Sequence, residues 1–222
     1  MNTLITTYYD NPEYLKKFID FNFTQDIFDH LIIVDDASPK FPLKNLLTEF
    51  DVSSITAYRI EDDIGFNSHA ARNLAAVECK TEWATFLDVD HILSSETFDD
   101  ISRFTELEED GWLSISHNQF TIPVKYYLAA GGYDERLNGF WWGDFLFEER
   151  LSALYSYEEL DVYSSTLLLK KVDGYPGITR LSKLQKDACL QKELEVRSNT
   201  SANPLDWHKH EILTFKWNEI CL

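Results

Sequence analysis

The sequence predicts an α/β fold in which helices flank a mostly parallel, Rossmann-like central sheet. Over the first hundred residues, short apolar runs alternate with amphipathic segments, which is the pattern of β-α-β units around a parallel sheet. Two of the apolar runs end in a pair of acidic residues, and ligands of open α/β sheets bind beyond the carboxyl ends of the strands. With 222 residues, of which 44% are hydrophobic, the chain can bury a sizeable core.

The first two predicted elements are a strand at residues 3–9 and a helix at residues 11–21. The strand is the apolar run "TLITTYY". Asn11 has a side chain that caps helices, and Pro12 suits the first helical position because the N–H that it lacks would have no partner there. The apolar residues that follow recur at helical spacing.

The later elements continue this alternation. Further strands are expected at residues 30–36, 53–60 and 83–90, and further helices at residues 67–80 and 94–111. Another helix is expected to begin at Asp144 and to run through Phe147, Leu151 and Leu154. Residues 183–222 form a charged segment, a polar loop and an aromatic closing stretch, which could close over a ligand, dock on the sheet or mediate association.

The charge of the chain limits its partners. It has 38 acidic and 20 basic residues, for a formal net charge of -18, which repels nucleic acid and anionic membrane surfaces. An anionic ligand therefore needs a metal ion or a focused pair of basic groups. No signal peptide or transmembrane run is visible, and Cys79, Cys189 and Cys221 are too scattered for a disulfide framework. A cytoplasmic setting is expected.

Polar side chains gather at the carboxyl ends of the predicted strands. The residues expected there are Thr7, Tyr9, Asp36, Asp88 and Asp90. No glycine-rich phosphate-binding fingerprint follows these strands, which argues against dinucleotide and Walker-type sites. Two acids at the end of an apolar strand are costly unless they meet a cation or hydrogen-bond donors. Asp88 and Asp90 therefore predict a functional site.

Six segments, taken in order, resemble motifs of the inverting nucleotide-sugar glycosyltransferases of family 2, which have the GT-A fold. Together they cover residues 3 to about 155. The segments are "LITTYYDNPEYL", "IIVDDASP", "GFNSHAARNLAA", "WATFLDVD", "FTIPVKYYLAAGGYDERL" and "WWGDFLFEERL". The resemblance implies a single GT-A-like domain over residues 1–222. Residues 1–100 would bind the nucleotide sugar, and residues 101–222 would form a smaller acceptor-side region that carries the catalytic base.

The resemblance also implies a donor site. Asp90 would bind Mn or Mg, and Asp88 would contact the ribose or the metal and its water shell. Thr7 and Asp36 would surround the nucleobase, where a carboxylate can accept the imide hydrogen of uracil and so favour a UDP-sugar. Tyr9 and Arg72 complete the implied nucleotide-sugar site, with Arg72 as a diphosphate contact. The donor would pass a hexosyl group to a glycan or to another hydroxyl acceptor.

The catalytic base implied by the resemblance is Asp144. The usual family pattern at this position is Glu-Asp-x-Asp, whereas this chain has Gly143 before the base and Leu146 at the second acidic position. Acids that often bind acceptor hydroxyls are therefore absent. Trp141 and Trp142 could stack on a sugar ring in their place.

A third metal ligand has two candidates. Many related enzymes use a downstream histidine, and here His208 and His210 come late in the chain. Their spacing would put both side chains on one side of a strand. His91 follows Asp90 directly, but on a continuous strand it would face the other way.

Alternative interpretations stay open for the fold and for single residues. Asp88 and Asp90 also resemble the nucleophile and general acid of haloacid-dehalogenase-type phosphatases. A degenerate GT-A module that binds nucleotide or glycan without turnover is a third possibility. Asp35 and Asp36 could simply form a turn, since "DDASP" has good turn chemistry, and Arg72 suits an ion pair between its helix and a carboxylate.

Overall fold

The structure is a computed structural model of the chain. It describes residues 1–23, 26–65, 67–107, 110–116, 118–137, 142–160, 166–168 and 210–221, together with single helical positions between 183 and 195. The statements below concern these residues.

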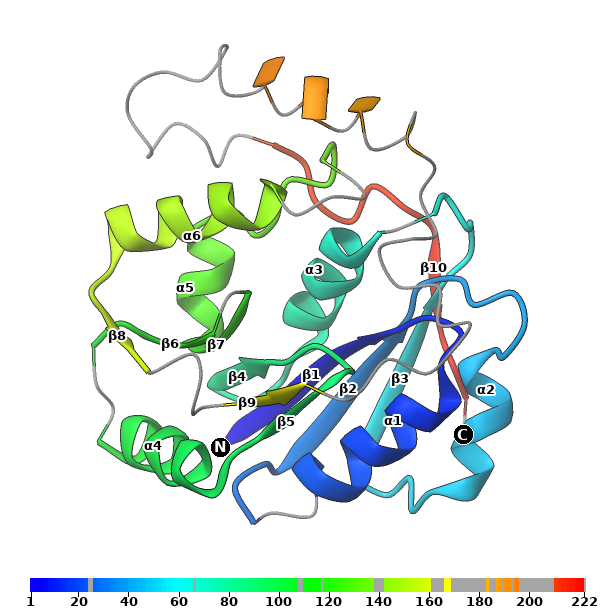
Figure 1. Cartoon of the computed structure of the whole chain (residues 1–222), viewed down its shortest axis with the longest axis horizontal. Coiled ribbons are helices and arrows are strands. Elements are labelled where there is room, and N and C mark those ends of the chain that lie inside the picture. The colour runs from blue at the N-terminus through cyan, green and yellow to red at the C-terminus, as the bar shows by residue number, and fades with distance from the viewer. Residues whose placement is uncertain are drawn as a thin grey trace.

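An eight-stranded mixed sheet forms the centre of the molecule (Figure 1), in the order β10-β3-β2-β1-β4-β7-β6-β8. Its strands are β1 (Asn2–Tyr8), β2 (His30–Asp35), β3 (Ile55–Ile60), β4 (Trp83–Phe86), β6 (Trp112–Ser116), β7 (Gln119–Pro123), β8 (Tyr157–Glu159) and β10 (Trp217–Glu219). The four central strands, β3, β2, β1 and β4, run parallel. The mostly parallel sheet predicted from the sequence is confirmed, with antiparallel additions on both sides.

Helices cover both faces of this sheet. They are α1 (Pro12–Phe18), α2 (Leu43–Leu46), α3 (Ser68–Glu78), α4 (Ser95–Glu106), α5 (Val124–Ala129) and α6 (Trp142–Leu154). One apolar core joins the sheet to α1, α2 and α4, and the other joins it to α3, α5 and α6. Successive strand residues serve opposite faces: on β1, Leu4 belongs to the first core and Ile5 to the second.

The first helix begins as its sequence indicates. The side chain of Asn11 accepts a hydrogen bond from the backbone N–H of Tyr14, and Pro12 is the first helical residue. The helix then continues as a π-helical turn at Ile19–Phe23. The side chain of Asn22 donates to the backbone carbonyl of His91 and accepts from the N–H of Leu93, so this turn holds the chain that follows β4.

The chain leaves the sheet earlier than the apolar run indicates. β4 ends at Phe86, and a turn follows before β5 (His91–Leu93), which pairs with β9 (Thr166–Leu168) in a separate two-stranded sheet. The prediction of a strand through residue 90 is therefore wrong. Because the strand ends early, Asp88 and Asp90 lie on a turn at the carboxyl edge of the sheet.

The closing segment docks on the sheet. β10 lies antiparallel to β3, with Trp217 opposite Ile60, and the ring of Trp217 meets that of Tyr58 edge to face, with a centroid separation of 5.7 Å. Among the described residues, no helix has both the length and the apolar character needed to cross a membrane.

Candidate active site

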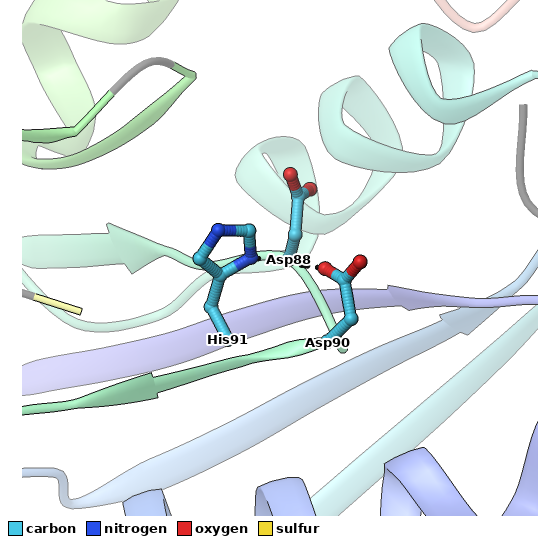
Figure 2. A group of neighbouring side chains, drawn as sticks. All are labelled: Asp88, Asp90 and His91. Atoms are coloured by element: carbon cyan, nitrogen blue, oxygen red, sulfur yellow. Dashed lines mark hydrogen bonds and ion pairs between the residues drawn. The ribbon is translucent and has the colours of Figure 1, made fainter. Parts of the chain in front are cut away.

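Three side chains with metal-ligating atoms converge just beyond β4. Asp88, Asp90 and His91 each offer one such atom, and these atoms lie within 4.8 Å of one another. Figure 2 shows the Asp88 carboxylate pointing toward α3 and the His91 ring turned toward Asp90. Nδ1 of His91 lies 2.9 Å from Oδ1 of Asp90. Carboxylate oxygens suit Mg and Mn, and imidazole is a common ligand of first-row transition metals.

The position of His91 corrects an expectation from the sequence. On a continuous strand His91 would face away from Asp90, because side chains alternate between the two faces. Here the N–H of His91 donates to the carbonyl of Asp88 at 3.0 Å and closes a turn. A turn does not alternate its side chains, so His91 and both carboxylates reach the same space.

Charge and burial shift the protonation of this cluster. Burial raises the pKa of the Asp88 carboxyl. The positive charge of Arg72 acts to lower this pKa, whereas the neighbouring Asp90 carboxylate raises it further. Burial by itself would lower the pKa of His91. However, the hydrogen bond to Asp90 and the negative charges of Asp88 and Asp90 raise the pKa of His91 above its usual value. The cluster therefore favours a bound positive charge.

Arg72 links Asp88 to the turn between β6 and β7. Its side chain is 3% exposed, and one terminal nitrogen lies 2.6 Å from Oδ1 of Asp88. The other donates to the carbonyl and the side-chain oxygen of Asn118 and to the hydroxyl of Tyr133, at 2.7 to 2.9 Å. The ion pair between this helix and a carboxylate, which the sequence offered as the structural interpretation, is confirmed. A direct diphosphate contact stays a prediction.

Asp35 and Asp36, at the end of β2, accept hydrogen bonds from different parts of the chain. Asp35 is fully buried, and its carboxylate accepts from the N–H groups of Ser38 and Leu43 and from Arg59 at 2.5 Å. It therefore forms the turn that the sequence indicated. Asp36 accepts instead from the N–H of Asn67, at the start of α3, at 2.9 Å.

The other two residues predicted for nucleotide binding also lie at this edge. Thr7 is half-buried near the carboxyl end of β1, opposite Val34 of β2. Tyr9 follows the strand, and its hydroxyl donates to Asp63 at 3.0 Å. Thr7, Tyr9 and Asp36 thus flank the same end of the two central strands. Their contacts with a nucleotide stay predictions.

Asp144 lies in the first turn of α6, which begins at Trp142 and not, as the sequence predicted, at Asp144 itself. The carboxylate is largely buried, with 11% of the side chain exposed, and its Oδ1 lies 3.1 Å from Nε2 of His69 on α3. The His69 ring stacks on Tyr133, with a centroid separation of 5.0 Å and an interplanar angle of 9°. Tyr133 in turn contacts Arg72, so packed side chains join Asp144 to the Asp88 cluster.

The glycine-rich segment before Tyr133 docks on α3. Gly132 has a φ of +64°, and an added Cβ would lie 2.4 Å from Oδ1 of Asn73. That oxygen accepts from the hydroxyl of Tyr127 and the N–H of Tyr133, both at 2.8 Å. A residue with a side chain at 132 would be strained and would displace Asn73. The glycine at position 132 therefore allows the backbone to approach a protein side chain closely.

The last predicted site residues come from the second half of the chain. Trp141 and His208 lie outside the described residues, and for Trp142 only the backbone, at the start of α6, is described. His210 lies in a bend and not in a strand, and its Nε2 is 3.2 Å from the carbonyl of Tyr133. The strand geometry that would have presented a late histidine to the metal does not occur at His210.

The sequence reading missed three side chains that organise the site. His69, Asn118 and Tyr133 each contact a predicted site residue or the arginine that holds one. Tyr133 and His69 belong to segments that the sequence singled out, so those motifs could have led to them. No pattern marks Asn118, because its contact with Arg72 joins residues 46 positions apart.

Comparisons with known proteins agree with this architecture. The model of a family described as "Glycosyltransferase like family 2" matches residues 7–109. S. aureus TarS 1-349 in complex with UDP-GlcNAc is a structural neighbour with a TM-score of 0.68 and 15% identity, covering 93% of this chain and 69% of that one. The mannosyltransferase PcManGT from Pyrobaculum calidifontis, in complex with GDP-Man and Mn2+, has a TM-score of 0.59 and 14% identity, with coverages of 92% and 66%.

The longer TarS structure shows how partial this overlap is. It has a TM-score of 0.63 and 15% identity, and the match covers 90% of this chain but only 44% of that protein. No curated protein sequence is significantly similar to the chain.

The fold is the GT-A fold of these structural neighbours. The family 2 glycosyltransferase-like model matches residues 7–109, so over that part of the chain the match agrees with the resemblance seen in the sequence motifs.

Proposed function

We propose that the chain is a metal-dependent, inverting glycosyltransferase that moves a hexosyl group from a UDP-sugar to a hydroxyl acceptor. The observation that carries the proposal is the convergence of Asp88, Asp90 and His91 at the carboxyl edge of the parallel strands. Ligands of open α/β sheets bind at this edge. The complexes of TarS with UDP and UDP-GlcNAc support a uridine donor by analogy.

The residues present fit a divalent cation. Two carboxylates and an imidazole form a donor set that Mn accepts. A bound cation would also offset the chain's net charge of -18 where a diphosphate approaches. Asp88, Asp90 and His91 would hold the ion, which would neutralise the charge that develops on the leaving diphosphate. Arg72 keeps the Asp88 carboxylate in place from behind. The Mn2+ in the PcManGT complex supports this choice of metal.

The nucleobase would lie between the ends of β1 and β2. Thr7 and Tyr9 are on one side of this region and Asp36 is on the other, fixed by its bond to the start of α3. A carboxylate at this place accepts the imide N–H of uracil, which cytosine lacks. The same site should therefore prefer UDP to CDP.

Asp144 would serve as the base. Inversion requires a group that removes the proton from the acceptor hydroxyl as its oxygen attacks the sugar from the face opposite the leaving group. Asp144 belongs to the half of the chain that follows residue 100, so donor and base come from different halves of one GT-A-like domain. Trp141 and Trp142 are proposed as stacking partners of a sugar acceptor.

Thermal shift of the purified protein tests the donor site. UDP, GDP, CDP and ADP are each added with Mn or with chelator. We expect stabilisation by UDP in Mn and little in chelator, since only a ligand that binds the folded state raises the unfolding temperature. Asp90→Asn should remove the part of the UDP-induced stabilisation that depends on Mn. Equal stabilisation by UDP in both conditions contradicts metal dependence, and a preference for GDP would change the donor class.

Turnover separates an enzyme from a degenerate binding module. In Mn, the wild-type protein should release UDP from UDP-GlcNAc with water as acceptor, and Asp144→Asn should abolish this release but keep the UDP-induced thermal shift. UDP binding without any turnover by the wild type would favour the binding module. The phosphatase alternative is disfavoured, because the family match spans the Asp-x-Asp segment and that segment follows the fourth strand of the sheet.

A further inference from the structure

Gly143, at the start of α6, lies directly against the ring of His69. A Cβ added to Gly143 would be 2.3 Å from Cε1 of His69 and 2.9 Å from its Nε2. Real Cβ atoms do not approach this closely, so any other residue at position 143 would force the ring to move.

The backbone of Gly143 gives no other reason for a glycine. Among the described residues the glycines with positive φ are Gly65, Gly111, Gly131 and Gly132, and Gly143 is not one of them. Glycine inside a helix costs about 0.5 to 1 kcal/mol relative to alanine. The position therefore accepts a helix-weakening residue that leaves room for His69.

His69 is held on every side that the structure describes. Its ring is 1% exposed, stacks on Tyr133 and packs against Gly143. The remaining contact is the 3.1 Å approach of Nε2 to Oδ1 of Asp144. The ring can therefore neither rotate nor withdraw from the carboxylate without displacing Tyr133 or the start of α6.

The hydrogen-bond partners of the His69 ring indicate its tautomer. Nδ1 of His69 is buried and has no hydrogen-bond partner among the described residues. A hydrogen on Nδ1 would be a buried donor without an acceptor, which is costly. The favourable assignment places the hydrogen on Nε2, where it is donated to Asp144.

The exposure of the His69 and Asp144 side chains indicates which of them can contact a substrate. The imidazole is almost completely buried, whereas 11% of the Asp144 side chain is exposed. His69 therefore lies behind the carboxylate. It binds Oδ1, and no described residue donates a hydrogen bond to Oδ2, which is the oxygen left for an acceptor hydroxyl.

We propose that His69 is a positioning residue for the base, and that Gly143 is present to make room for it. This inference rests on the proposed role of Asp144 as base. The imidazole on α3, in the donor half, fixes the orientation of a carboxylate on α6, in the acceptor half. In the usual Glu-Asp-x-Asp pattern an acid precedes the base; here a glycine does, and a histidine from another helix contacts the base.

The test measures UDP release from UDP-GlcNAc in Mn for the wild type, His69→Ala and His69→Gln. Misplacing a reacting group by about 1 Å can cost roughly a hundredfold in rate, so we expect His69→Ala to lower kcat ten- to a hundredfold with little change in KM for the donor. His69→Gln retains an N–H donor of similar reach and should recover part of the rate. His30→Gln, on a histidine at the start of β2 that bonds Thr56, is the matched control and should leave kcat unchanged.

A double-mutant cycle tests the steric part without an activity assay. Gly143→Ala should lower the thermal stability of the wild type and should lower it much less in the His69→Ala background, where the space is free. Equal destabilisation in both backgrounds overturns the role assigned to Gly143.

The outcomes distinguish this inference from the function on which it rests. If the wild type shows no turnover of the UDP-sugar, the proposed function fails and the positioning role fails with it. If the wild type turns over and folded His69→Ala keeps the wild-type kcat, the positioning role alone is overturned. A fall in kcat for His69→Ala with partial recovery in His69→Gln supports it.

Discussion

The guanidinium of Arg72 and the carboxylate of Asp88 form an ion pair at 2.6 Å whose two partners differ in exposure. The side chain of Arg72 is 3% exposed and that of Asp88 is 37% exposed. Although burial alone would lower it, the neighbouring Tyr133 and Asp88 raise the pKa of Arg72, so this buried charge is permanent. It gives the turn that carries Asp88 and Asp90 a fixed anchor on α3.

Replacing Arg72 should therefore destabilise the fold as well as the site. Breaking a buried ion pair lowers the free energy of unfolding by about 3 to 5 kcal/mol. Because Asp88 is partly exposed, we expect Arg72→Met to cost about 3 kcal/mol, near the lower end of this range. The matched control is Arg103→Met, because Arg103 forms exposed pairs with Asp100 and Glu158 that are worth less than about 1 kcal/mol. Urea unfolding of both variants measures the difference; similar losses would contradict the anchoring role.

His91 should contribute directly to metal affinity. If it is a ligand, His91→Ala should weaken Mn binding at least tenfold, since even residues that only support a ligand contribute ten- to a hundredfold. Isothermal titration with Mn in the absence of nucleotide measures this. His210→Ala should bind Mn as the wild type does, because Nε2 of His210 is engaged with the carbonyl of Tyr133. A loss in His210→Ala and none in His91→Ala would reverse the assignment.

In the presence of chelator, His91 and His30 should contribute to the stability of the fold with opposite dependences on pH. The folded-state pKa of His91 is raised, so its stabilising contribution is present below the unfolded value of about 6.5 and is lost as pH rises through the folded value. Burial lowers the pKa of His30, so its contribution is present above about pH 6.5 and is lost as pH falls toward the folded value. The difference in melting temperature between the wild type and each His→Gln variant, measured from pH 5 to 8, should therefore slope in opposite directions. Equal slopes would contradict the raised pKa of His91.

Glu135 should hold the C-terminal segment against the domain. Its buried carboxylate accepts from the N–H groups of Leu213 and Thr214, both at 2.8 Å, from the Thr214 hydroxyl at 2.6 Å and from Asn73 at 2.9 Å. Glu135→Gln turns one acceptor into a donor that faces other donors, and we expect a loss of about 2 kcal/mol.

Hydrogen exchange localises the effect of Glu135→Gln. The amides of residues 213 and 214 should exchange faster in the variant, while those of the central strands stay protected. Glu13→Gln, on an exposed residue in the first turn of α1, is the control and should change neither region. Unchanged exchange at 213 and 214 would mean that other contacts hold the segment.

The sequence predicted strands β1 to β4 and helices α1, α3, α4 and α6 because each is specified locally. Asn11 and Pro12 mark the start of α1, and the apolar runs of β1, β2 and β4 were correctly predicted to be strands of a parallel sheet. It also placed the acids at the carboxyl edge. The error at β4 was a boundary error, since an apolar run that continues into a turn does not show where the hydrogen bonding of the strand stops.

The sequence by itself thus determined the α/β order, the family-type motifs and the edge at which polar groups gather, because periodicity and capping act between residues close in the chain. Only the tertiary structure decided that His91 faces Asp90, that Arg72 holds Asp88, and that His69 lies behind Asp144. The last two contacts join different elements, and the first depends on a turn that no local pattern marks. Side-chain packing between α3, α6 and the turn after β4 sets them, and that packing exists only once the sheet has brought these segments together.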